Sequence, residues 1–406
     1  MNVLLRGLKS LDKQNGIFDR LPLDVRTLVK TPRTVISENH PDGLYHHFGL
    51  REGITKRLIH RSTSHLPDQV DILINIDGIP ISGSSPSQLW PILGMIKGDR
   101  QPFPIGIFHG HKKPSCSNTF LERFVTEARS LTNIELAEKE VSVKILCIIC
   151  DAPAKSFILG IFGHTSKHGC PKCTTIGKYY VCPGKKHGRV VFLDLDAPAR
   201  LHEDFFSEHH SHHHVTKTLL ADLDIDLVED IVLDYMHLVC IGVMRKLLTY
   251  WIKRDTTRDL IDRLAQTTIS SRLLRTREYV PEDFVRLPRS LADLHFWKAT
   301  ELRQFLLYTG PVVLKGVIPE SLYDHFMCLH TAIRLLSSEN HCRKFNSYAE
   351  QLLRYFVKES GKLYGPQFVS HNVHCLIHLP ADVMKFGHLD LFSSFPFENY
   401  LQYLKK

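Results

Sequence analysis

The chain has 406 residues, of which 43% are hydrophobic, enough to bury the core of one large domain or of two to three ordinary ones. Its 51 Lys and Arg against 43 Asp and Glu give a net charge of +8, which suits a polyanionic partner without identifying one. No apolar run is long enough to span a membrane, and charges interrupt "MNVLLRGLKSLDK" before a signal-peptide core could form. We therefore expect an intracellular protein with no membrane partner, whose ten cysteines are reduced thiols.

Residues 1–65 carry turn and charge signals with weak periodicity, and we interpret them as an N-terminal extension of helix and loops. Within this extension, one stretch predicts a short helix followed by an extended segment: "LPLDVRTLVKTPRTV". Three apolar runs separated by Gly, Pro and Ser then predict three successive strands: "VDILINIDG", "SQLWPILGMIKG" and "PFPIGIFHG".

A helix and a fourth strand follow. The helix is predicted from apolar residues at helical spacing in "SCSNTFLERFVTEARSLTN". The strand is predicted from a nearly continuous apolar run, typical of burial on both faces, in "VSVKILCIICD". The order β-β-β-α-β is the start of an RNase H-like α/β fold with a mixed sheet, so residues 66–165 are interpreted as the first part of such a core.

Residues 166–370 are predicted to be a zinc loop and a large, mainly helical insertion in that core. The first part is rich in Gly, His and Pro and predicts loops up to about residue 227. Helical periodicity then appears in "VLDYMHLVCIGVMRKLLTYWIKR", "ESLYDHFMCLHTAIRLLS" and "YAEQLLRYFVKESGKLYG". Residues 371–406, with a pair of histidines and a C-terminal helix, are expected to complete the core.

Three acids are candidate ligands for divalent metal ions. Asp77 ends the first predicted strand and Asp151 ends the fourth, so both would emerge at the same end of the sheet if these strands are neighbours. Mg²⁺ prefers oxygen ligands, and two ions held roughly 4 Å apart can cleave a phosphodiester. A third acid, Glu398, lies just inside the C-terminal helix. The alternative is that the aspartates bond turn amides and that Glu398 is an ordinary first-turn residue.

A second candidate site combines cysteines and histidines. Cys170 and Cys173 in "CPKC" form half of a zinc site, although redox dithiols share this spacing. His374 and His378 lie four residues apart, so they face the same side of a helix and could supply the other half. Such a site would join segments about two hundred residues apart and close the helical block onto the sheet. The alternative is that these histidines bond carbonyl groups.

Other polar features are less specific. The histidine-rich stretch "EHHSHHH" (208–214) is interpreted as a loop that binds metal only adventitiously. His237 and Asp234 lie on an otherwise apolar segment, where core packing is the default and proximity to an active site is the alternative. Three basic stretches are interpreted as solvated faces, some of which bind phosphates: "GHKKP", "CPGKKHGR" and "WIKR".

From about residue 20 to the end, the chain resembles the DDE transposases of the CACTA (En/Spm) group, in the form found in arthropod genomes. This group is distantly similar to the catalytic core of the V(D)J recombinase and Transib lineage. Several phrases carry the resemblance in the right order: "INIDGIPISGSSPSQLWPILG", "ICDAPAKSFILGIFGHTSKHGCPKC", "LDYMHLVCIGVMRKLL", "FWKATELRQFLLYTGPVVLK", "NVHCLIHL" and "FSSFPFENYLQYLKK".

The resemblance implies a catalytic triad of Asp77, Asp151 and Glu398 that binds two Mg²⁺ or Mn²⁺ ions. His237 matches the family's Met-His motif and would neighbour the active site. The implied reaction is hydrolytic nicking of DNA, followed by attack of the freed 3′-hydroxyl on another phosphodiester. The resemblance also implies a homodimer, a nuclear location and no small-molecule cofactor.

The same resemblance implies a structural zinc ion, with ligands Cys170, Cys173, His374 and His378. The chain ends eight residues after Glu398, so we expect a truncated catalytic helix. No helix-turn-helix or zinc-finger module for terminal-repeat recognition is evident near the N-terminus. A second hypothesis therefore stays open, that of a catalytically inactive or domesticated remnant acting as a zinc-stabilised DNA- or protein-binding protein.

Overall fold

The structure is a computed structural model. It describes residues 2–11, 18, 20–28, 37–59, 66–82, 85–136, 138–206, 212–252 and 260–405, in two units, 1–39 and 40–406. The first unit contains α1 (Asn2–Leu11) and α2 (Val25–Leu28), and the Val25 amide donates to Asn2 Oδ1 at 2.8 Å. Helix α2 confirms a short helix in this region, while the extended segment predicted after it lies mostly outside the described residues.

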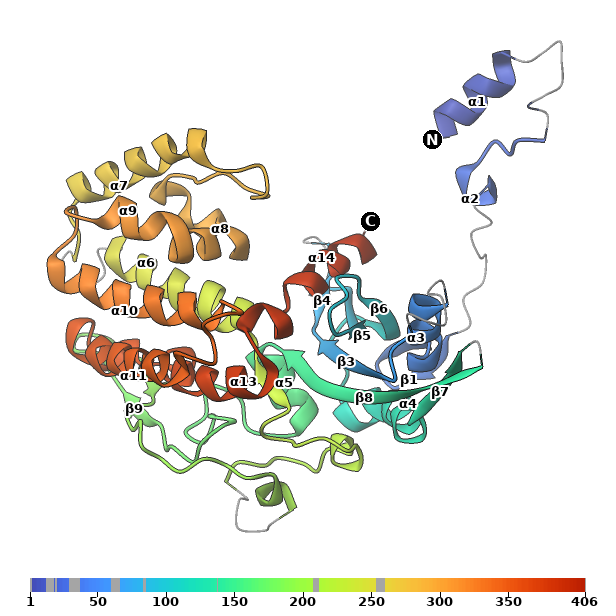
Figure 1. The fold of residues 1–406 in the computed structure, drawn as a ribbon, viewed down its shortest axis with the longest axis horizontal. Coiled ribbons are helices and arrows are strands. Elements are labelled where there is room, and N and C mark those ends of the chain that lie inside the picture. Colours follow the sequence, from blue (N-terminus) through green and yellow to red (C-terminus); the bar gives the residue numbers. More distant parts are fainter. Residues whose placement is uncertain are drawn as a thin grey trace. The chain divides into compact units, whose positions relative to one another are not determined.

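A mixed sheet of nine strands organises the second unit (Figure 1). The main path runs β1-β2-β6-β5-β3-β8-β11, while β4 pairs with β5 and β7 with β8. Neighbours β3, β5 and β6 are antiparallel, whereas β3, β8 and β11 are parallel. The strands are β1 (Glu38–His40), β2 (Gly43–His47), β3 (Gln69–Ile76), β4 (Ile79–Pro80), β5 (Gln88–Ile96), β6 (Phe103–Gly110), β7 (Asn133–Leu136), β8 (Lys139–Cys150) and β11 (Ile231–Leu233).

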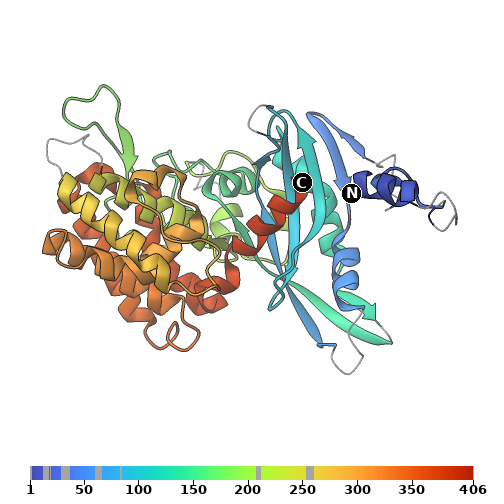
Figure 2. The ribbon, with the colours of Figure 1, turned by 90° about the horizontal axis from the view of Figure 1, so that it is seen from above.

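Helices cover the sheet and form a separate block beside it (Figure 2). On the sheet lie α3 (Leu50–Leu58), α4 (Ser117–Ser130), α5 (Ala152–Leu159) and α14 (Phe395–Leu404). The helical block contains α6 (Arg245–Ile252), α7 (Arg263–Arg275), α8 (Ala299–Gln304), α9 (Gly310–Leu314), α10 (Glu320–Leu336), α11 (Asn346–Leu363), α12 (His371–Cys375) and α13 (Leu379–Phe386). A hairpin of β9 (Lys178–Tyr180) and β10 (Arg189–Val191) precedes this block.

Short helical turns connect these elements. Two π-helical segments span Met236–Met244 and Phe305–Thr309. The 3₁₀ segments are His202–Phe206, Leu219–Asp222, Thr276–Tyr279, Leu291–Phe296, Pro366–Phe368, Leu376–His378 and Leu389–Phe392.

The predicted α/β class with a mixed sheet is confirmed. The predicted strands and helix occur in the predicted order, although β4 and β7 come between them. The three predicted runs form β3, β5 and β6, the predicted helix is α4, and the fourth strand is β8. Five further strands of the sheet were not predicted, namely β1, β2, β4, β7 and β11. Strand β2 lies within the expected N-terminal extension. Tyr45 is the only buried residue of this strand, so no alternation of apolar residues predicted it.

Strand β11 corrects the helix predicted from Val232 onward. Three buried residues form β11, and the helical segment begins only after Asp234. A three-residue apolar run in a parallel strand cannot be told from the first turn of a buried helix by periodicity. The helices predicted further on are confirmed as α10 and α11.

Side chains of β3 and β8 alternate between two apolar cores. Ile72 and Ile74 belong, with Ile148, to the core that includes α4 and α5. Leu73 and Cys147 belong to the core shared with the helical block. The sheet is therefore covered on both faces here, which explains the almost unbroken apolar sequence of β8.

One extra residue in β8 sets the register of the parallel pair. Ile72 pairs with Ile145, but Leu73 pairs with Cys147, so Leu146 forms a bulge. Beyond the bulge Asn75 is opposite Ile149, and its buried side-chain Nδ2 donates to the Ile149 carbonyl at 3.0 Å. Two residues further along, this register brings the ends of both strands level.

All ten cysteines are free thiols, as expected, and Cys147 and Cys150 are core residues. Among the described residues, no helix combines the length and the apolar character that crossing a membrane requires.

A buried ion pair links the helical block to the sheet. Lys172 Nζ, 7% exposed, lies 2.8 Å from Asp382 Oδ1, on α13, and also donates to the Val228 carbonyl at 2.8 Å. The other carboxylate oxygen, Asp382 Oδ2, accepts from the Leu233 amide of β11 at 2.8 Å. One carboxylate therefore joins the loop between the two predicted zinc cysteines to both α13 and the sheet.

Replacing Lys172 by Met should strongly destabilise the protein, because it leaves the Asp382 carboxylate buried without its cation. We expect a loss of about 3–5 kcal/mol in the free energy of unfolding, measured by denaturant titration. The control is Lys56→Met on α3, whose ion pair with Glu52 is largely exposed and should contribute less than about 1 kcal/mol. Equal losses in the two variants would contradict this assignment.

Candidate metal centres

Asp77 and Asp151 follow directly after two neighbouring parallel strands, as the sequence predicted they would if β3 and β8 were adjacent. Continuing the register past Asn75 places Asp77 level with Asp151. Without the extra residue in β8, Asp77 would instead be level with Cys150. The bulge therefore brings the two carboxylates to the same place at the sheet edge.

Each aspartate is oriented by one backbone amide. Asp77 Oδ1 accepts from the Gly78 amide at 2.7 Å. Asp151 Oδ1 accepts from the Ala154 amide at 2.7 Å and so caps the N-terminus of α5. The bonds to turn amides, foreseen as an alternative, are therefore present. They use one oxygen of each carboxylate, and the second oxygen can serve a cation.

Helix α14 brings Glu398 to the same edge. Ligand atoms of Asp77, His237 and Glu398 all lie within 4.8 Å of one another. Asp151 is not part of this group, but it is close enough for its charge to affect Asp77. Burial, followed by the charges of Asp151 and Glu398, raises the pKa of Asp77 to about 7, although His237 opposes the shift. Bringing these negative charges together is costly unless a cation neutralises them.

A buried carboxylate holds His237 in place. His237 Nδ1 lies 2.6 Å from Asp234 Oδ2, which leaves Nε2 free to serve the acidic cluster. Burial lowers the pKa of His237, but the hydrogen bond and charge of Asp234, with the charges of Asp77 and Asp151, outweigh it and raise that pKa to about 9. Without a bound cation, His237 is therefore a positively charged imidazolium at neutral pH.

Asp234, to which sequence reasoning gave no role, also anchors the helix of Glu398. It is 3% exposed, and its Oδ1 accepts from the amide of Ser394, the N-cap residue of α14, at 2.8 Å. Burial raises the pKa of Asp234, but the bonds from His237 and Ser394 lower it overall. The Asp234 carboxylate thus positions both His237 and the helix that carries Glu398. The only signal in the sequence was an acid three residues before a histidine.

A cavity of about 340 Å³ adjoins this cluster. The residues that line it include Asp151, His237, Ser156, His164 and Asn372. Its volume is within the usual range of ligand pockets, about 300–1,000 Å³. Asp151 and His237 therefore face a space that can admit part of a substrate.

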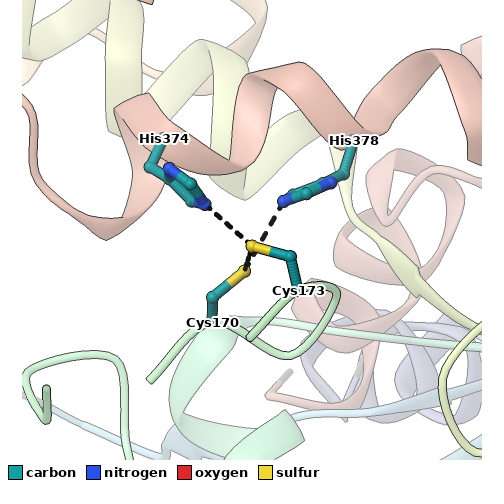
Figure 3. Close-up of side chains that lie close together, drawn as sticks. All are labelled: Cys170, Cys173, His374 and His378. Carbon is teal, nitrogen blue, oxygen red and sulfur yellow. Dashed lines mark hydrogen bonds between the residues drawn. The ribbon is translucent and has the colours of Figure 1, made fainter. Parts of the chain in front are cut away.

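The predicted cysteine and histidine pairs converge into a second cluster (Figure 3). Cys173 Sγ lies 3.3 Å from His374 Nε2 and 3.5 Å from Cys170 Sγ, while Cys170 Sγ lies 3.6 Å from His378 Nε2. Tetrahedral zinc with ordinary bond lengths requires ligand–ligand distances of about 3.3–3.8 Å. This buried Cys/His cluster can therefore hold a metal ion such as zinc. The alternative that these histidines bond only carbonyls is not what the structure shows.

The thiols also have the electrostatics of a metal site. Burial opposes ionisation of Cys170, but hydrogen bonds from Cys173, Cys375 and the two imidazoles hold its pKa well below the usual value. The bond to Cys170 and burial in turn raise the pKa of Cys173. One thiolate is thus stabilised at the expense of the other, and a divalent cation would stabilise both.

Arg200, which sequence reasoning missed, supports the loop around this cluster. It is 5% exposed and donates from Nε to the Cys170 carbonyl at 2.9 Å, and its amide donates to the Lys172 carbonyl at 2.9 Å. No local pattern distinguishes this arginine from a surface residue, because the contact spans 30 positions.

The histidine-rich stretch lies partly outside the described residues. In its described part, His213 is buried and its Nδ1 lies 2.7 Å from the His168 carbonyl, and burial lowers its pKa to about 3. His212 stacks on His168, and His214 packs against Phe205. These described histidines pack the loop against the zinc segment.

Comparison of the chain with protein-family models and with curated proteins finds no match. Inference about what the protein does therefore depends on the two clusters and the fold that positions them.

Replacing Cys173 by Ser should abolish stable zinc binding, because it removes one of four ligands. We expect zinc, measured by elemental mass spectrometry, to fall from about one ion per chain to a small fraction, with a lower unfolding temperature. The control is Cys182→Ser, a partly exposed thiol outside the cluster. Unchanged zinc in Cys173→Ser, or equal loss in the control, would contradict a site of four ligands.

The His237–Asp234 pair should make stability depend on pH. The pKa of His237 is about 9 in the folded state and about 6.5 when unfolded, so its stabilisation is complete below pH 6.5 and lost as pH rises through 9. Between pH 7 and 9, without added divalent ions, wild type should lose on the order of 2 kcal/mol more stability than His237→Gln. Chemical denaturation measures this difference, and parallel pH profiles would contradict it.

Proposed function

We propose that the protein is a DDE-type, transposase-like enzyme that hydrolyses phosphodiester bonds and joins DNA strands with divalent metal ions. The convergence of Asp77, His237 and Glu398 within 4.8 Å, with Asp151 at the matching end of the neighbouring strand, carries the proposal. Three carboxylates from segments far apart in the chain meet at one sheet edge, an arrangement that costs stability without a cation.

The topology supports an RNase H-like core. Three antiparallel strands are followed by a helix and by β8, which returns as a parallel neighbour of β3. Residues 166–370 then contribute the zinc segment and most of the helical block before the chain returns to the sheet in α14 (Figures 1 and 2). This arrangement supports the proposed division into an interrupted core and an insertion, in which β11 is the part of the insertion that joins the sheet.

The acidic cluster suits Mg²⁺ or Mn²⁺, because its donors are mainly carboxylate oxygens. Ions bound there would activate water or a 3′-hydroxyl and stabilise the leaving oxygen. Asp77, Asp151 and Glu398 are the proposed ligands. His237, held by Asp234, supplies either a further nitrogen ligand or a positive charge beside the phosphate undergoing substitution.

The second cluster is proposed to hold structural zinc. Its four donors come from a loop after α5 and from the segment preceding α13, so the ion would fasten the helical block to the sheet. We further propose that DNA is the substrate, that the active form is a homodimer, and that the protein works in the nucleus without a small-molecule cofactor. The net charge of +8 suits such a polyanionic substrate.

Purified, zinc-loaded protein should convert supercoiled plasmid to the nicked form when Mn²⁺ is added, as followed on agarose gels. Asp77→Asn, Asp151→Asn and Glu398→Gln should each lower the rate on the order of 100-fold or more, because each removes a charge that holds the ions in place. The control, Glu282→Gln, neutralises an exposed acid and should retain the full rate.

The same assay separates this proposal from the alternative of a catalytically silent, zinc-stabilised binding protein. Nicking that is absent in wild type, or that survives in Asp151→Asn, would overturn the proposed catalysis. A folded, zinc-loaded protein that binds DNA but does not nick it would instead be the inactive remnant.

A further inference from the structure

A basic groove of about 700 Å³ opens in the helical block, and neither Asp77 nor Glu398 lines it. Four cationic side chains line it, and no acidic residue does: Arg245, Arg286, Arg289 and Lys298. Ile241 lines both this groove and the cavity beside Asp151 and His237, so the two spaces are neighbours.

Two of the four cations form the rigid wall of the groove. Arg245 donates to the Leu294 carbonyl at 3.1 Å and to the Trp297 carbonyl. Arg289 binds both carboxylate oxygens of Glu301, at 2.6 and 2.7 Å. These bonds fix the segment that carries the outer residues of the groove.

The other two cations are available to a ligand. Arg286 and Lys298 are exposed, and in the described part of the chain neither forms an ion pair. Two such cations on the border of a groove without acids can each approach a phosphate.

The groove also presents an aromatic surface. The Phe296 side chain is 60% exposed, and its ring centroid lies 3.6 Å from that of His295. A large exposed ring is costly in water, and a nucleobase can cover it by stacking. Cations combined with an exposed ring are typical of sites for single-stranded nucleic acid.

We propose that this groove binds a single-stranded segment of DNA, with a base stacked on Phe296 and phosphates bound by Arg286 and Lys298. A duplex keeps its bases stacked inside, so only an unpaired strand can cover the ring. Because the groove neighbours the cavity beside Asp151, the bound segment would be a strand released near the cut. This assignment of its origin rests on the proposed function, whereas the binding itself does not.

Binding is tested with a fluorescent ten-nucleotide oligothymidine and with a duplex of the same length, by anisotropy, without added Mg²⁺ or Mn²⁺. Phe296→Ala should weaken single-strand binding about tenfold, as loss of one stacked base requires, and leave duplex binding unchanged. The double variant Arg286→Ala/Lys298→Ala should make the slope of log K against log salt for the oligothymidine shallower by about 1.4, since each phosphate contributes about 0.7.

The turn between α10 and α11 offers matched controls. It carries Arg343, Lys344 and Phe345, whose ring is 36% exposed and packs against His341 at 5.7 Å. Phe345→Ala and Arg343→Ala/Lys344→Ala make the same chemical changes outside the groove and should leave binding as in wild type. Retained zinc and unfolding temperature in all variants confirm that they fold.

The inference is overturned if Phe296→Ala binds oligothymidine as wild type does, or if the control variants lose as much affinity as the groove variants. It is independent of the nicking assay. If the groove variants change oligothymidine binding as expected but the wild-type protein does not nick DNA, the groove assignment holds and the proposed catalysis is wrong. If the wild-type protein nicks DNA normally but the groove variants bind oligothymidine as wild type does, the proposed catalysis holds and the groove is not the single-strand site.

Discussion

The parallel pairing of β3 with β8, shifted by one bulged residue, is the constraint on which the acidic cluster depends. Leu146 changes the register so that Asp77 and Asp151 end level with each other. A one-residue slip would move every side chain of one strand to the opposite face. The buried side chain of Asn75, bonded to the Ile149 carbonyl, holds this register at its last paired position.

The short strand β11 and the residue after it connect the sheet to both side-chain clusters by hydrogen bonds. Its last residue, Leu233, donates to Asp382 in the segment that follows His374 and His378. The next residue, Asp234, binds both His237 and the start of the helix that carries Glu398. Consecutive residues thus connect the Cys/His cluster and the acidic cluster to one edge of the sheet, so a disturbance of either cluster acts on the same short strand.

Much of the core could be predicted from local pattern. The apolar runs of β3, β5, β6 and β8 are long and bounded by turn residues, and the two acids follow strands directly. The spacing of Cys170 and Cys173, and that of His374 and His378, predicted two pairs of metal ligands. Strands β2 and β11 were missed because each is short and owes its conformation to a partner distant in sequence.

The sequence by itself determined the ligand types, their local spacing and the strands that carry two of the acids, because these depend on neighbours within a few residues. Only the tertiary structure decided that Glu398 approaches Asp77, that the cysteine pair faces the histidine pair, and that Asp234 joins His237 to the helix of Glu398. The bond of Ser394 to Asp234 spans 160 positions and the contacts between the cysteines and the histidines span more than 200, so no local pattern encodes them. They follow from strand register and from burial, which only the folded chain defines.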